Sequence, residues 1–557
     1  MRALAPLRRA AHSERGYTMV VAMMVLLVSG LLVTAAFVSA EGDVKLTRTN
    51  LSQERAYEAA QAALQVYQYN LNTSALYWET CPRTESPEFR KVPGSTEEEY
   101  SYRTLAATGY TQSECETKHR QYMILESKHP ATGTFRVEAV GKSGSSTRKI
   151  IATLYHPGYL SYVFLSNYEV EDPSTFEGEE PKNCEHYYEE RVAKKYTEEC
   201  PTIPFINEDE INGPFHTNDA VSICNTPIFG RKEFQKTENE DLIEMGEGNY
   251  AYTFCTDKPT IYGKYLSGKS VSTILPPETD NELLEAASYT FSGRTFVELK
   301  EGTPNKLWVV NAEKPKGEEK EFPANGVIFI KNGKEVATKC RKYSPFDSNA
   351  SYEEDSECGD VYIKGKYTES LTVGAANDVI IVGSLETTHE ASGKPTGTAA
   401  LGLIADKFVR VFHPVNCNKC TNKLTRGQLE GPCNATNMKA GEGPPKNWGL
   451  EALNKTGWGS QKDITVDAAI LSTKNSWIVD NFLCPEKSKP EPLGTLTVWG
   501  AISQFWRGRV TCDSGADCGY LKSYNYDERL KTDQPPSFLS PASSSGWTIE
   551  RETRPPG

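Results

Sequence analysis

The first clear pattern in the chain is an apolar run of 24 residues, Tyr17 to Ala40, that contains no charged side chain. A helix needs about 20 residues, at about 1.5 Å each, to cross the ~30 Å hydrocarbon core of a bilayer. The apolar part of an ordinary secretory signal is shorter, at roughly 7 to 15 residues. Arg8, Arg9 and Arg15 precede the run and place the N-terminus on the cytoplasmic side. The sequence therefore predicts a single-pass membrane anchor, with the rest of the chain exported.

A second apolar pattern follows the anchor and has the period of a helix. One stripe recurs at spacings of 4, 3, 4 and 4 residues, namely Ala56, Ala60, Ala63, Tyr67 and Leu71. Such spacing places the side chains on one face of a helix. Residues 17–71 are therefore expected to form one rod on the order of 80 Å long, whose lower stripe needs a covering layer. The alternative is a plain signal anchor followed by an unrelated helix.

The boundary at the start of the apolar run carries a family resemblance. A polar leader ends in Glu14-Arg15-Gly16, and Tyr17-Thr18-Met19-Val20-Val21 begins the run at once. This boundary resembles the prepilin cleavage site of type IV pilins and type II secretion pseudopilins, and residues 53–64 resemble the matching helix of PilX-like proteins. The resemblance implies that a prepilin peptidase cuts after Gly16 and that Tyr17 is then methylated. It also implies that the helix later packs into a filament core.

Position 21 departs from the usual pattern of that family. Most pilins carry Glu at the fifth mature position and pair it with the N-terminal amine of a neighbouring subunit, whereas this chain has Val21. An apolar residue there resembles the PilX-type minor pilins and the K-type pseudopilin, which sit at or near filament tips. A tip subunit has no neighbour above it whose N-terminal amine must be neutralised. The resemblance therefore implies that Val21 belongs to a subunit assembled at the tip.

Beyond the helix, polar and apolar positions alternate as they do in strands. Gln121–Glu126, Thr134–Val140 and Arg148–Tyr155 are expected to be strands, and Lys142–Ser146 is expected to be a hairpin turn. A small antiparallel sheet built from these strands would cover the apolar stripe of the helix.

After residue 158 the chain consists of short apolar runs between long polar loops. Short strands with Gly or Asn at the corners suit a parallel β-helix, in which each coil buries its face against the next. A β-sandwich gives similar runs. The expected fold class is therefore α+β, with a long helix and a small antiparallel sheet followed by a large all-β domain. This domain is expected to be a right-handed parallel β-helix or, alternatively, a β-sandwich. The clearest runs are Gly326–Ile330, Asp360–Gly365, Ser370–Val373, Asp378–Gly383, Ala400–Ala405, Phe408–Phe412 and Leu496–Gly500.

These patterns divide the chain into five parts. The large part also resembles an uncharacterised class of pilin-like exported proteins at Tyr168–Pro173, Ile211–Asp219 and Tyr524–Leu530, a resemblance that carries no known chemistry. The last residues are rich in Ser, Pro and Gly and are expected to be a frayed, disordered tail. The expected parts are a leader over 1–16, the helix over 17–71, a small β domain over 72–157, a large β domain over 158–540 and the tail over 541–557.

Composition limits the partners and the redox state. The formal net charge is −13 and no basic patch is visible, which excludes nucleic acid as a partner. All 14 cysteines follow residue 80, and exported thiols meet oxidising conditions. Disulfides are therefore expected, with these local pairs as candidates: Cys81 with Cys115, Cys184 with Cys200, Cys224 with Cys255, Cys340 with Cys358, and Cys512 with Cys518.

The remaining cysteines leave two interpretations open. His413, Cys417, Cys420 and Cys433 have a spacing that suits a Cys3His zinc site. The exported location favours disulfides instead, with Cys484 as a further partner.

One polar cluster beside an apolar run is a candidate ligand site. Its oxygen ligands suit calcium, whereas its histidine favours zinc or another transition metal, and a glycan is a further candidate. The alternative is a corner of the chain in which these side chains bond to the backbone. The candidate ligands are Glu169, Asp172, His216, Asn218 and Asp219.

The aromatic residues are a third set of candidate binding residues, after the cysteines and the polar cluster. Their side chains stack on sugars or anchor protein interfaces, although more often they fill cores. No Gly-rich phosphate loop, nucleophile elbow or metalloprotease helix appears, so no enzymatic activity and no cofactor are expected. The tryptophans of the last quarter are Trp448, Trp458, Trp477, Trp499, Trp506 and Trp547.

Together with the export signal, the resemblance implies an exported minor pilin that primes or caps a type IV filament and displays a β-rich domain for adhesion or partner contact. Its expected partners are the membrane, the prepilin peptidase, other pilins of the filament, and a surface glycan or a cell-surface partner. It is expected first in the cytoplasmic membrane and then in a cell-surface filament. The alternatives are a tip pseudopilin of a type II secretion system and a membrane-anchored β-helical enzyme that acts on a polysaccharide.

Overall fold

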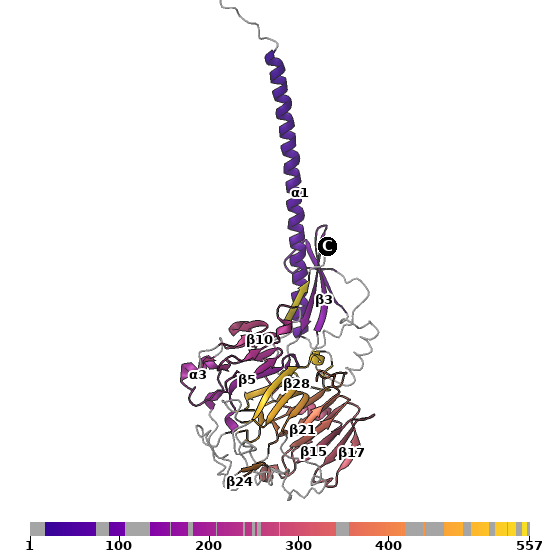
Figure 1. Ribbon diagram of the computed structural model, residues 1–557. Helices are drawn as coiled ribbons and strands as arrows, with labels where there is room; N and C mark the ends of the chain where they lie inside the picture. The colour runs from indigo at the N-terminus through magenta and orange to yellow at the C-terminus, as the bar shows by residue number, and fades with distance from the viewer. Residues whose placement is uncertain are drawn as a thin grey trace, which may run out of the picture.

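A computed structural model of the chain has a long helix, a small antiparallel sheet and a large β-rich region (Figure 1). Helix α1 spans Tyr17–Thr73 as one element. The structure describes residues 17–73, 89–105, 134–155, 158–175, 182–207, 209–237, 240–247, 251–252, 258–277, 279–340, 356–413, 415–417, 438–440, 462–482, 492–511, 518–531, 533–541 and 548–553.

The upper half of α1 has no covering layer. Met19–Ala40 has a mean hydropathy of 2.6, and none of this span is buried inside the protein. Within the part of the chain that the structure describes, it is the one helix that is long and apolar enough to cross a membrane. The apolar helix expected from the sequence is therefore confirmed, and it is compatible with a membrane anchor.

The lower half of α1 packs on the small sheet, whose strands run in the order β1-β2-β3-β4-β30. Ala56, Ala60, Ala63 and Tyr67, which belong to the stripe expected from the sequence, are at most 1% exposed. All the pairings in this sheet are antiparallel, as expected. The strands are β1 (Arg90–Lys91), β2 (Glu98–Leu105), β3 (Thr134–Ser143), β4 (Ser146–Tyr155) and β30 (Thr548–Thr553).

The hairpin of β3 and β4 requires glycine at two positions. Gly141 of β3 faces the helix, where an added Cβ would lie 2.0 Å from the carbonyl oxygen of Ala56 and 2.3 Å from the amide nitrogen of Ala60. Gly144 has φ +57° and begins the two-residue turn between β3 and β4, a conformation that glycine adopts without strain. The hairpin and the strands expected over Thr134–Val140 and Arg148–Tyr155 are confirmed. Gln121–Glu126 lies outside the described residues.

The C-terminal strand corrects one prediction. Residues 541–557 are expected from their composition to be frayed, but Thr548–Thr553 forms β30 and pairs antiparallel with β4. The exposed edge of β4 offers unpaired backbone groups, and an added strand satisfies them whatever its side chains are. The large region is therefore inserted between two neighbouring strands of the small sheet, and Figure 1 shows the C-terminal end of the chain beside β3.

The strands of the large region form long parallel ladders. One ladder runs β14-β18-β20-β22-β26-β28-β5-β7-β10-β13. A second runs β15-β19-β21-β23-β27. A third runs β26-β28-β29-β6-β9-β12, because the long strands β26 and β28 each belong to two ladders. The side chains between the ladders form one continuous apolar core that extends from Val163 to Tyr526.

The elements of the ladders have the following bounds. The first ladder contains β5 (Phe164–Glu171), β7 (Phe215–Thr217), β10 (Leu242–Met245), β13 (Lys264–Ser267), β14 (Tyr289–Ser292), β18 (Val327–Lys331), β20 (Leu371–Ala375), β22 (Leu401–Ala405), β26 (Ile464–Ser472) and β28 (Gly494–Arg507). The others contain β6 (Glu210–Asn212), β9 (Ile228–Phe229), β12 (Thr260–Ile261), β15 (Thr295–Lys300), β19 (Val361–Lys366), β21 (Val379–Glu386), β23 (Val409–Val411), β27 (Trp477–Val479) and β29 (Tyr520–Tyr526). Each of the seven strands expected from the sequence between Gly326 and Gly500 coincides with one of these elements.

Shorter elements lie outside the three ladders. The pair β16 (Lys306–Val310) and β17 (Glu318–Glu321) extends β15 in antiparallel fashion. The remaining elements are α3 (Tyr188–Lys194), α4 (Asn281–Ala286), α5 (Val336–Lys339), the parallel pair β8 (Ser222–Ile223) and β11 (Ala251–Tyr252), and the antiparallel pair β24 (Val415–Cys417) and β25 (Met438–Ala440).

The chain enters the first ladder in its middle. Strand β5 is the first strand of the large region and lies between β7 and β28. Of the strands in this ladder, β28 comes last in the sequence. From β5 the chain advances through β7 and β10 to β13 at one end of the ladder. It then resumes at β14, at the other end, and returns strand by strand to β28. The contact between β28 and β5, here called the seam, therefore joins the beginning and the end of the large region.

The segment that connects the two ends of the ladder packs along its side. This segment, residues 271–277 and 279–287, is called the strap. Ile274 and Leu283 of the strap are at most 1% exposed and share an apolar cluster with residues from four strands of the first ladder. The strand residues of that cluster are Leu165, Val327, Phe329, Ile404 and Leu471.

Two disulfides expected from the sequence are confirmed. Cys184–Cys200 and Cys340–Cys358 have Cα–Cα distances of 5.4 and 4.9 Å. Cys224 and Cys518 are also disulfide-bonded. Their expected partners lie outside the described residues, as do Cys81, Cys115, Cys420, Cys433 and Cys484.

Candidate functional site

The candidate ligands from the sequence lie at the seam and beside the strap. Glu169 is on β5, Asp172 directly follows β5, and His216 is on β7 with Asn218 and Asp219 after it. All five are at most 4% exposed. They lie together because β5 and β7 are neighbours in the first ladder. The structure thus brings the five residues into one buried region, where they form three separate sets of contacts.

The first set joins Glu169 to Arg507 across the seam. Glu169 Oε2 lies 3.1 Å from Arg507 Nη1, and Glu169 also accepts a hydrogen bond from the Ser166 hydroxyl. The guanidinium carbon of Arg507 is 3.7 Å from the ring centroid of Phe205. Burial raises the pKa of Glu169 above its ordinary value, and the charge of Arg507 opposes this shift. Arg507 therefore compensates a carboxylate that water does not reach.

Asp219 extends this set towards α3. Its carboxylate accepts hydrogen bonds from three backbone amides, those of Glu169 at 3.0 Å, Tyr188 at 2.7 Å and Ala220 at 2.9 Å. Arg191 of α3 completes the set, with Nη1 at 2.8 Å from Asp219 Oδ2. Asp219 therefore attaches α3 and its disulfide-linked segment to the ladder.

The second set links His216 and Asn218 to the strap. His216 Nδ1 is 3.0 Å from Glu244 Oε2, and its Nε2 is 2.9 Å from Asn218 Oδ1. Asn218 Nδ2 donates to the carbonyl of Ile274 at 2.7 Å, and its Oδ1 accepts from the amide of Ile274 at 2.9 Å. The side chain of Asn218 thus pairs with the strap backbone as another strand would.

The third set holds the chain after β5. Asp172 Oδ1 accepts from the Ser174 amide at 2.9 Å, and its Oδ2 accepts from Asn475 Nδ2 at 3.0 Å and the Ser476 hydroxyl at 2.9 Å. Burial raises the pKa of Asp172, and these donors oppose the shift.

Each of the five side chains has hydrogen-bond or ion-pair partners within the protein, both backbone groups and side chains. In the described part of the chain, no three His, Cys, Asp or Glu side chains form a group that could hold a metal ion. His413 is fully buried, and its carbonyl accepts a hydrogen bond from Asn481. The zinc interpretation also depends on cysteine side chains outside the described residues, so it stays a prediction.

Aromatic residues gather beside the seam. Trp506 of β28 stacks on Tyr168 of β5 at 4.6 Å between ring centroids, and Tyr168 also contacts Tyr187 at 5.2 Å and Phe505 at 5.5 Å. Tyr168, Tyr187 and Phe505 are half-buried, so part of this cluster faces solvent. These four residues are called the aromatic cluster. Of the six tryptophans named in the sequence analysis, Trp506 lies in this cluster.

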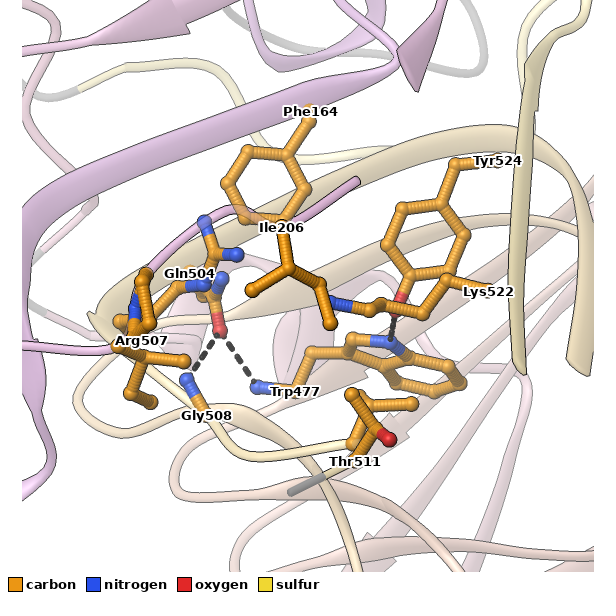
Figure 2. A pocket seen from close by; sticks show the side chains of 12 residues that line it. Phe164, Ile206, Trp477, Gln504, Arg507, Gly508, Thr511, Lys522 and Tyr524 are labelled. Atoms are coloured by element: carbon orange, nitrogen blue, oxygen red, sulfur yellow. Dashed lines mark hydrogen bonds between the residues drawn. The ribbon is translucent and has the colours of Figure 1, made fainter. Parts of the chain in front are cut away.

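Trp477 has a different place, in the apolar core. It is 1% exposed, and its Nε1 donates to the Tyr524 hydroxyl at 3.0 Å. Figure 2 shows Trp477 and Tyr524 around a small cavity, with Lys522 between them and Ile206. The cavity has a volume of about 10 Å³, which is room for about one water molecule. Trp448, Trp458 and Trp547 lie outside the described residues.

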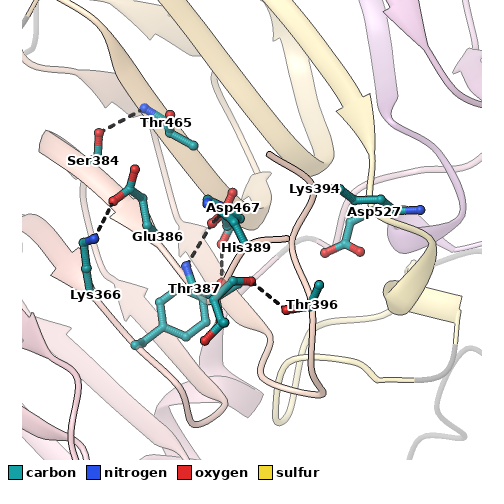
Figure 3. A network of polar contacts seen from close by, with 12 residues as sticks. Lys366, Ser384, Glu386, Thr387, His389, Lys394, Thr396, Thr465, Asp467 and Asp527 are labelled. Atoms are coloured by element: carbon teal, nitrogen blue, oxygen red, sulfur yellow. Dashed lines mark hydrogen bonds and ion pairs between the residues drawn. The ribbon is translucent and has the colours of Figure 1, made fainter. Parts of the chain in front are cut away.

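One polar network was not anticipated from the sequence. Asp467 of β26 is buried, and its Oδ2 lies 2.7 Å from His389 Nε2 and accepts from the Thr387 amide at 2.9 Å (Figure 3). Among the described residues, its Oδ1 finds no hydrogen-bond partner. Burial raises the pKa of Asp467 to about 6, and His389 opposes the shift. Asp467 interrupts an otherwise apolar strand sequence, which is the signal that could have marked it.

This network holds a loop against the ladder. Arg529 donates to the carbonyls of Thr396 at 2.9 Å and Ala399 at 3.1 Å, and it forms an ion pair with Asp527 at 2.7 Å. Asp467 and Arg529 together thus fasten both sides of the loop over residues 387–399.

Comparison with solved structures finds matches for this chain, among them a pilin. No family model matches the chain, and no curated protein matches it. The crystal structure of the competence-associated pilin ComZ from Thermus thermophilus is 10% identical and aligns over 90% of this chain and 97% of that chain, with a TM-score of 0.31. A TM-score of this size does not establish a shared fold.

Proposed function

We propose that this protein is an exported minor pilin, anchored by α1, that primes or caps a type IV filament and displays its large β region outward. The architecture of α1 is the observation that supports the proposal most directly. Its upper half, Met19–Ala40, has no covering layer, while its lower half is covered by the small sheet. An apolar rod of this kind needs either lipid or the helices of other subunits around it.

The place of the large region supports a role at the tip. It is inserted between β4 and β30 and therefore leaves the small sheet at the end that Figure 1 shows away from the upper half of α1. A region of nearly 400 residues at that position crowds a helical lattice but has free space at a filament end. Val21 agrees with this place, because a subunit without Glu there needs no amine from a neighbour above it.

Processing tests the pilin assignment. The mature protein is expected to begin at Tyr17, which N-terminal sequencing measures. Gly16→Leu should block cleavage, because only a minimal side chain fits the peptidase at this position. Gly30→Leu is the matched control, since an added Cβ at Gly30 has no neighbour within 4 Å. A start near residue 40, or cleavage that Gly16→Leu leaves intact, would refute the assignment.

Position in the filament tests the tip assignment. Quantitative proteomics of sheared filaments should find this protein far below the major subunit, and gold labelling should mark filament ends. Val21→Glu should increase its incorporation along the shaft, whereas Val20→Glu, at a similarly exposed neighbouring position, should not. Uniform labelling of the wild-type shaft would exclude the tip assignment, whatever the outcome for processing.

We also propose that the large region is a right-handed parallel β-helix rather than a β-sandwich. The parallel ladders support this, since a sandwich is built mainly from antiparallel pairs. We propose adhesion or partner contact as the role of this region, with the aromatic cluster as the surface offered to a glycan. A glycan array measures this, and Tyr187→Ala should reduce binding.

The proposal contains no catalytic activity and no cofactor. Hydrolysis of any member of a polysaccharide panel, or stoichiometric zinc in the purified protein, would refute this part. A tip pseudopilin of a type II secretion system remains the second candidate, because Val21 suits it equally. Loss of secretion without loss of filaments after gene deletion would favour that candidate.

A further inference from the structure

A lysine and an aspartate meet in the core between β29 and β6. Lys522 lies on β29, and Asp209 directly precedes β6. The two strands run parallel with Ser523 opposite Glu210, so Lys522 and Asp209 are direct neighbours in register. Lys522 Nζ is 2.6 Å from Asp209 Oδ1, and their side chains are 7% and 2% exposed. These residues come from the last and the first parts of the large region.

The pair lies among buried apolar side chains and two arginines, Arg507 and Arg509. Figure 2 shows the Lys522 side chain beside Ile206, Trp477 and Tyr524. The carboxyl group is fixed in orientation, because Asp209 Oδ2 accepts a hydrogen bond from the Ile206 amide at 3.0 Å. The other carboxylate oxygen, Asp209 Oδ1, faces the Lys522 amine. Lys522 helps to line the cavity of about 10 Å³, which has room for about one water.

The charges around Lys522 favour a neutral amine. Burial lowers the pKa of Lys522, and the positive charges of Arg507 and Arg509 lower it further, while Asp209 opposes them. Transfer of the proton from the amine to the carboxylate removes two buried charges, which avoids the desolvation penalty of two ions. A desolvated neutral lysine is a nucleophile. Because the Lys522 amine and the Asp209 carboxyl group are held in contact, their reaction is intramolecular. Well-oriented intramolecular reactions reach effective molarities of roughly 10⁵–10⁸ M.

We propose that Lys522 and Asp209 form an intramolecular isopeptide bond. The Lys522 ammonium first gives a proton to the Asp209 carboxylate, which leaves a neutral amine and a carboxylic acid. The Nζ lone pair then attacks Asp209 Cγ, the C–N bond forms, the C–OH bond breaks, and the hydroxyl leaves with an amine proton as one water. The step needs no oxidant, reductant or co-reactant. The cavity beside Lys522 receives the released water.

Such a bond would close the large region on itself. Strand β29 pairs with β28 on one side and with β6 on the other, so the bond would join the last strands of the region to the first. Because the chain enters and leaves the region near the seam, pulling on the small sheet would load these strands first. A covalent link there would hold the two chain ends together under load. This inference does not depend on the proposed filament role, since the link needs only the fold.

Mass spectrometry of the full-length protein tests the proposal. The protein is purified from membranes, reduced and alkylated under denaturing conditions, and then digested. The expected result is one branched peptide that contains Lys522 and Asp209 and weighs one water less than its two component peptides. Lys364 and Glu298 are the internal control, because they are strand neighbours at 3.9 Å but 17% and 30% exposed, and they should stay unlinked.

Variants make the result specific. Lys522→Arg keeps a cation beside Asp209 and should abolish the branched peptide, which peptide mapping reads even if stability falls. Asp209→Asn should give the same branched peptide as the wild type, because its amide carbon loses ammonia where the acid loses water. Recovery of the two unlinked peptides in full from folded wild-type protein would overturn the proposal, and so would a branched peptide that persists in Lys522→Arg.

Discussion

The sharpest test of the seam is the removal of Arg507. Its guanidinium lies 3.1 Å from Glu169 Oε2 and packs on Phe205, and both side chains of the ion pair are at most 4% exposed. Arg507→Met keeps most of the apolar volume and removes the charge. Glu169 is then left beside the carboxylate of Asp219, with the Ser166 hydroxyl as a remaining donor.

The expected cost follows from the burial of Glu169. Breaking a buried pair by removing one partner typically costs about 3–5 kcal/mol, because the remaining charge is uncompensated. Replacing both partners by apolar residues of similar volume is often neutral or stabilising by about 1–4 kcal/mol. The double variant Arg507→Met/Glu169→Leu should therefore be far more stable than Arg507→Met alone, with a coupling energy of about 3 kcal/mol or more.

The loss of stability caused by Arg507→Met should change with pH in one direction. Burial already raises the pKa of Glu169, and loss of the Arg507 charge raises it further. When the folded-state pKa of a carboxyl is raised, folding takes up a proton, so stability falls as pH rises through that range. The cost of Arg507→Met should therefore be smaller at about pH 5 than at about pH 8.

Chemical unfolding of the full-length protein in detergent measures these values. Trp506 stacks on Tyr168 across the seam, so its fluorescence reports on this contact, and Trp506→Phe variants identify its share of the signal. Lys300→Met is the control, because its ion pair with Glu319 is largely exposed and should contribute at most about 1 kcal/mol. A cost below about 1 kcal/mol for Arg507→Met, or additivity in the double variant, would refute the reasoning.

Three further predictions concern the helix, the strap and its charge. Gly141→Val should separate α1 from β3, because a Cβ would lie 2.0 Å from a helix carbonyl; we expect a loss of at least about 2 kcal/mol, seen as faster proteolysis of the small sheet. Asn218→Ala should cost about 2–3 kcal/mol, since it leaves the amide and carbonyl of Ile274 unpaired, and hydrogen exchange at Ile274 should rise. Asp280→Asn should stabilise by about 1–2 kcal/mol at about pH 7 and have no effect near pH 4, because burial and the charge of Asp406 raise the pKa of Asp280 to about 6. Thermal unfolding across this pH range measures the last effect, and equal stabilisation at both ends would contradict it.

Local patterns of the sequence predicted the long helix and part of the strands. The period of Ala56, Ala60, Ala63 and Tyr67 identifies the face of α1 that is buried, since each position depends only on its neighbours three and four residues away. The short apolar runs identify the strands for the same reason. Cys184–Cys200 and Cys340–Cys358 were also predictable, because both pairs are close in sequence.

Contacts between distant parts of the chain were not predictable from such patterns. The residues of β30 have the composition of a disordered tail, and they form a strand because the edge of β4 is available to them. The entry of the chain at β5 depends on the pairing of β28 with β5, which no local pattern encodes. The partners of Glu169 and Asp172, Arg507 and Ser476, likewise come from the far end of the sequence. A polar residue within a strand indicates that a polar side chain is buried at a cost in free energy. It does not identify the partner that compensates this cost.

The path of the chain explains where the buried charges lie. A ladder that began at one end and finished at the other would need no special contact in its middle. Here β5 and β28 meet in the middle, and apolar side chains alone would allow many alternative strand neighbours, because one parallel strand resembles another. The ion pairs of Glu169 with Arg507 and of Glu171 with Arg509, at 3.1 and 2.9 Å, lie at this seam. A wrong neighbour would leave these charges buried without a partner, at a cost of several kcal/mol each. The buried polar residues that resemble a ligand site in the sequence therefore select the correct closure of the large region.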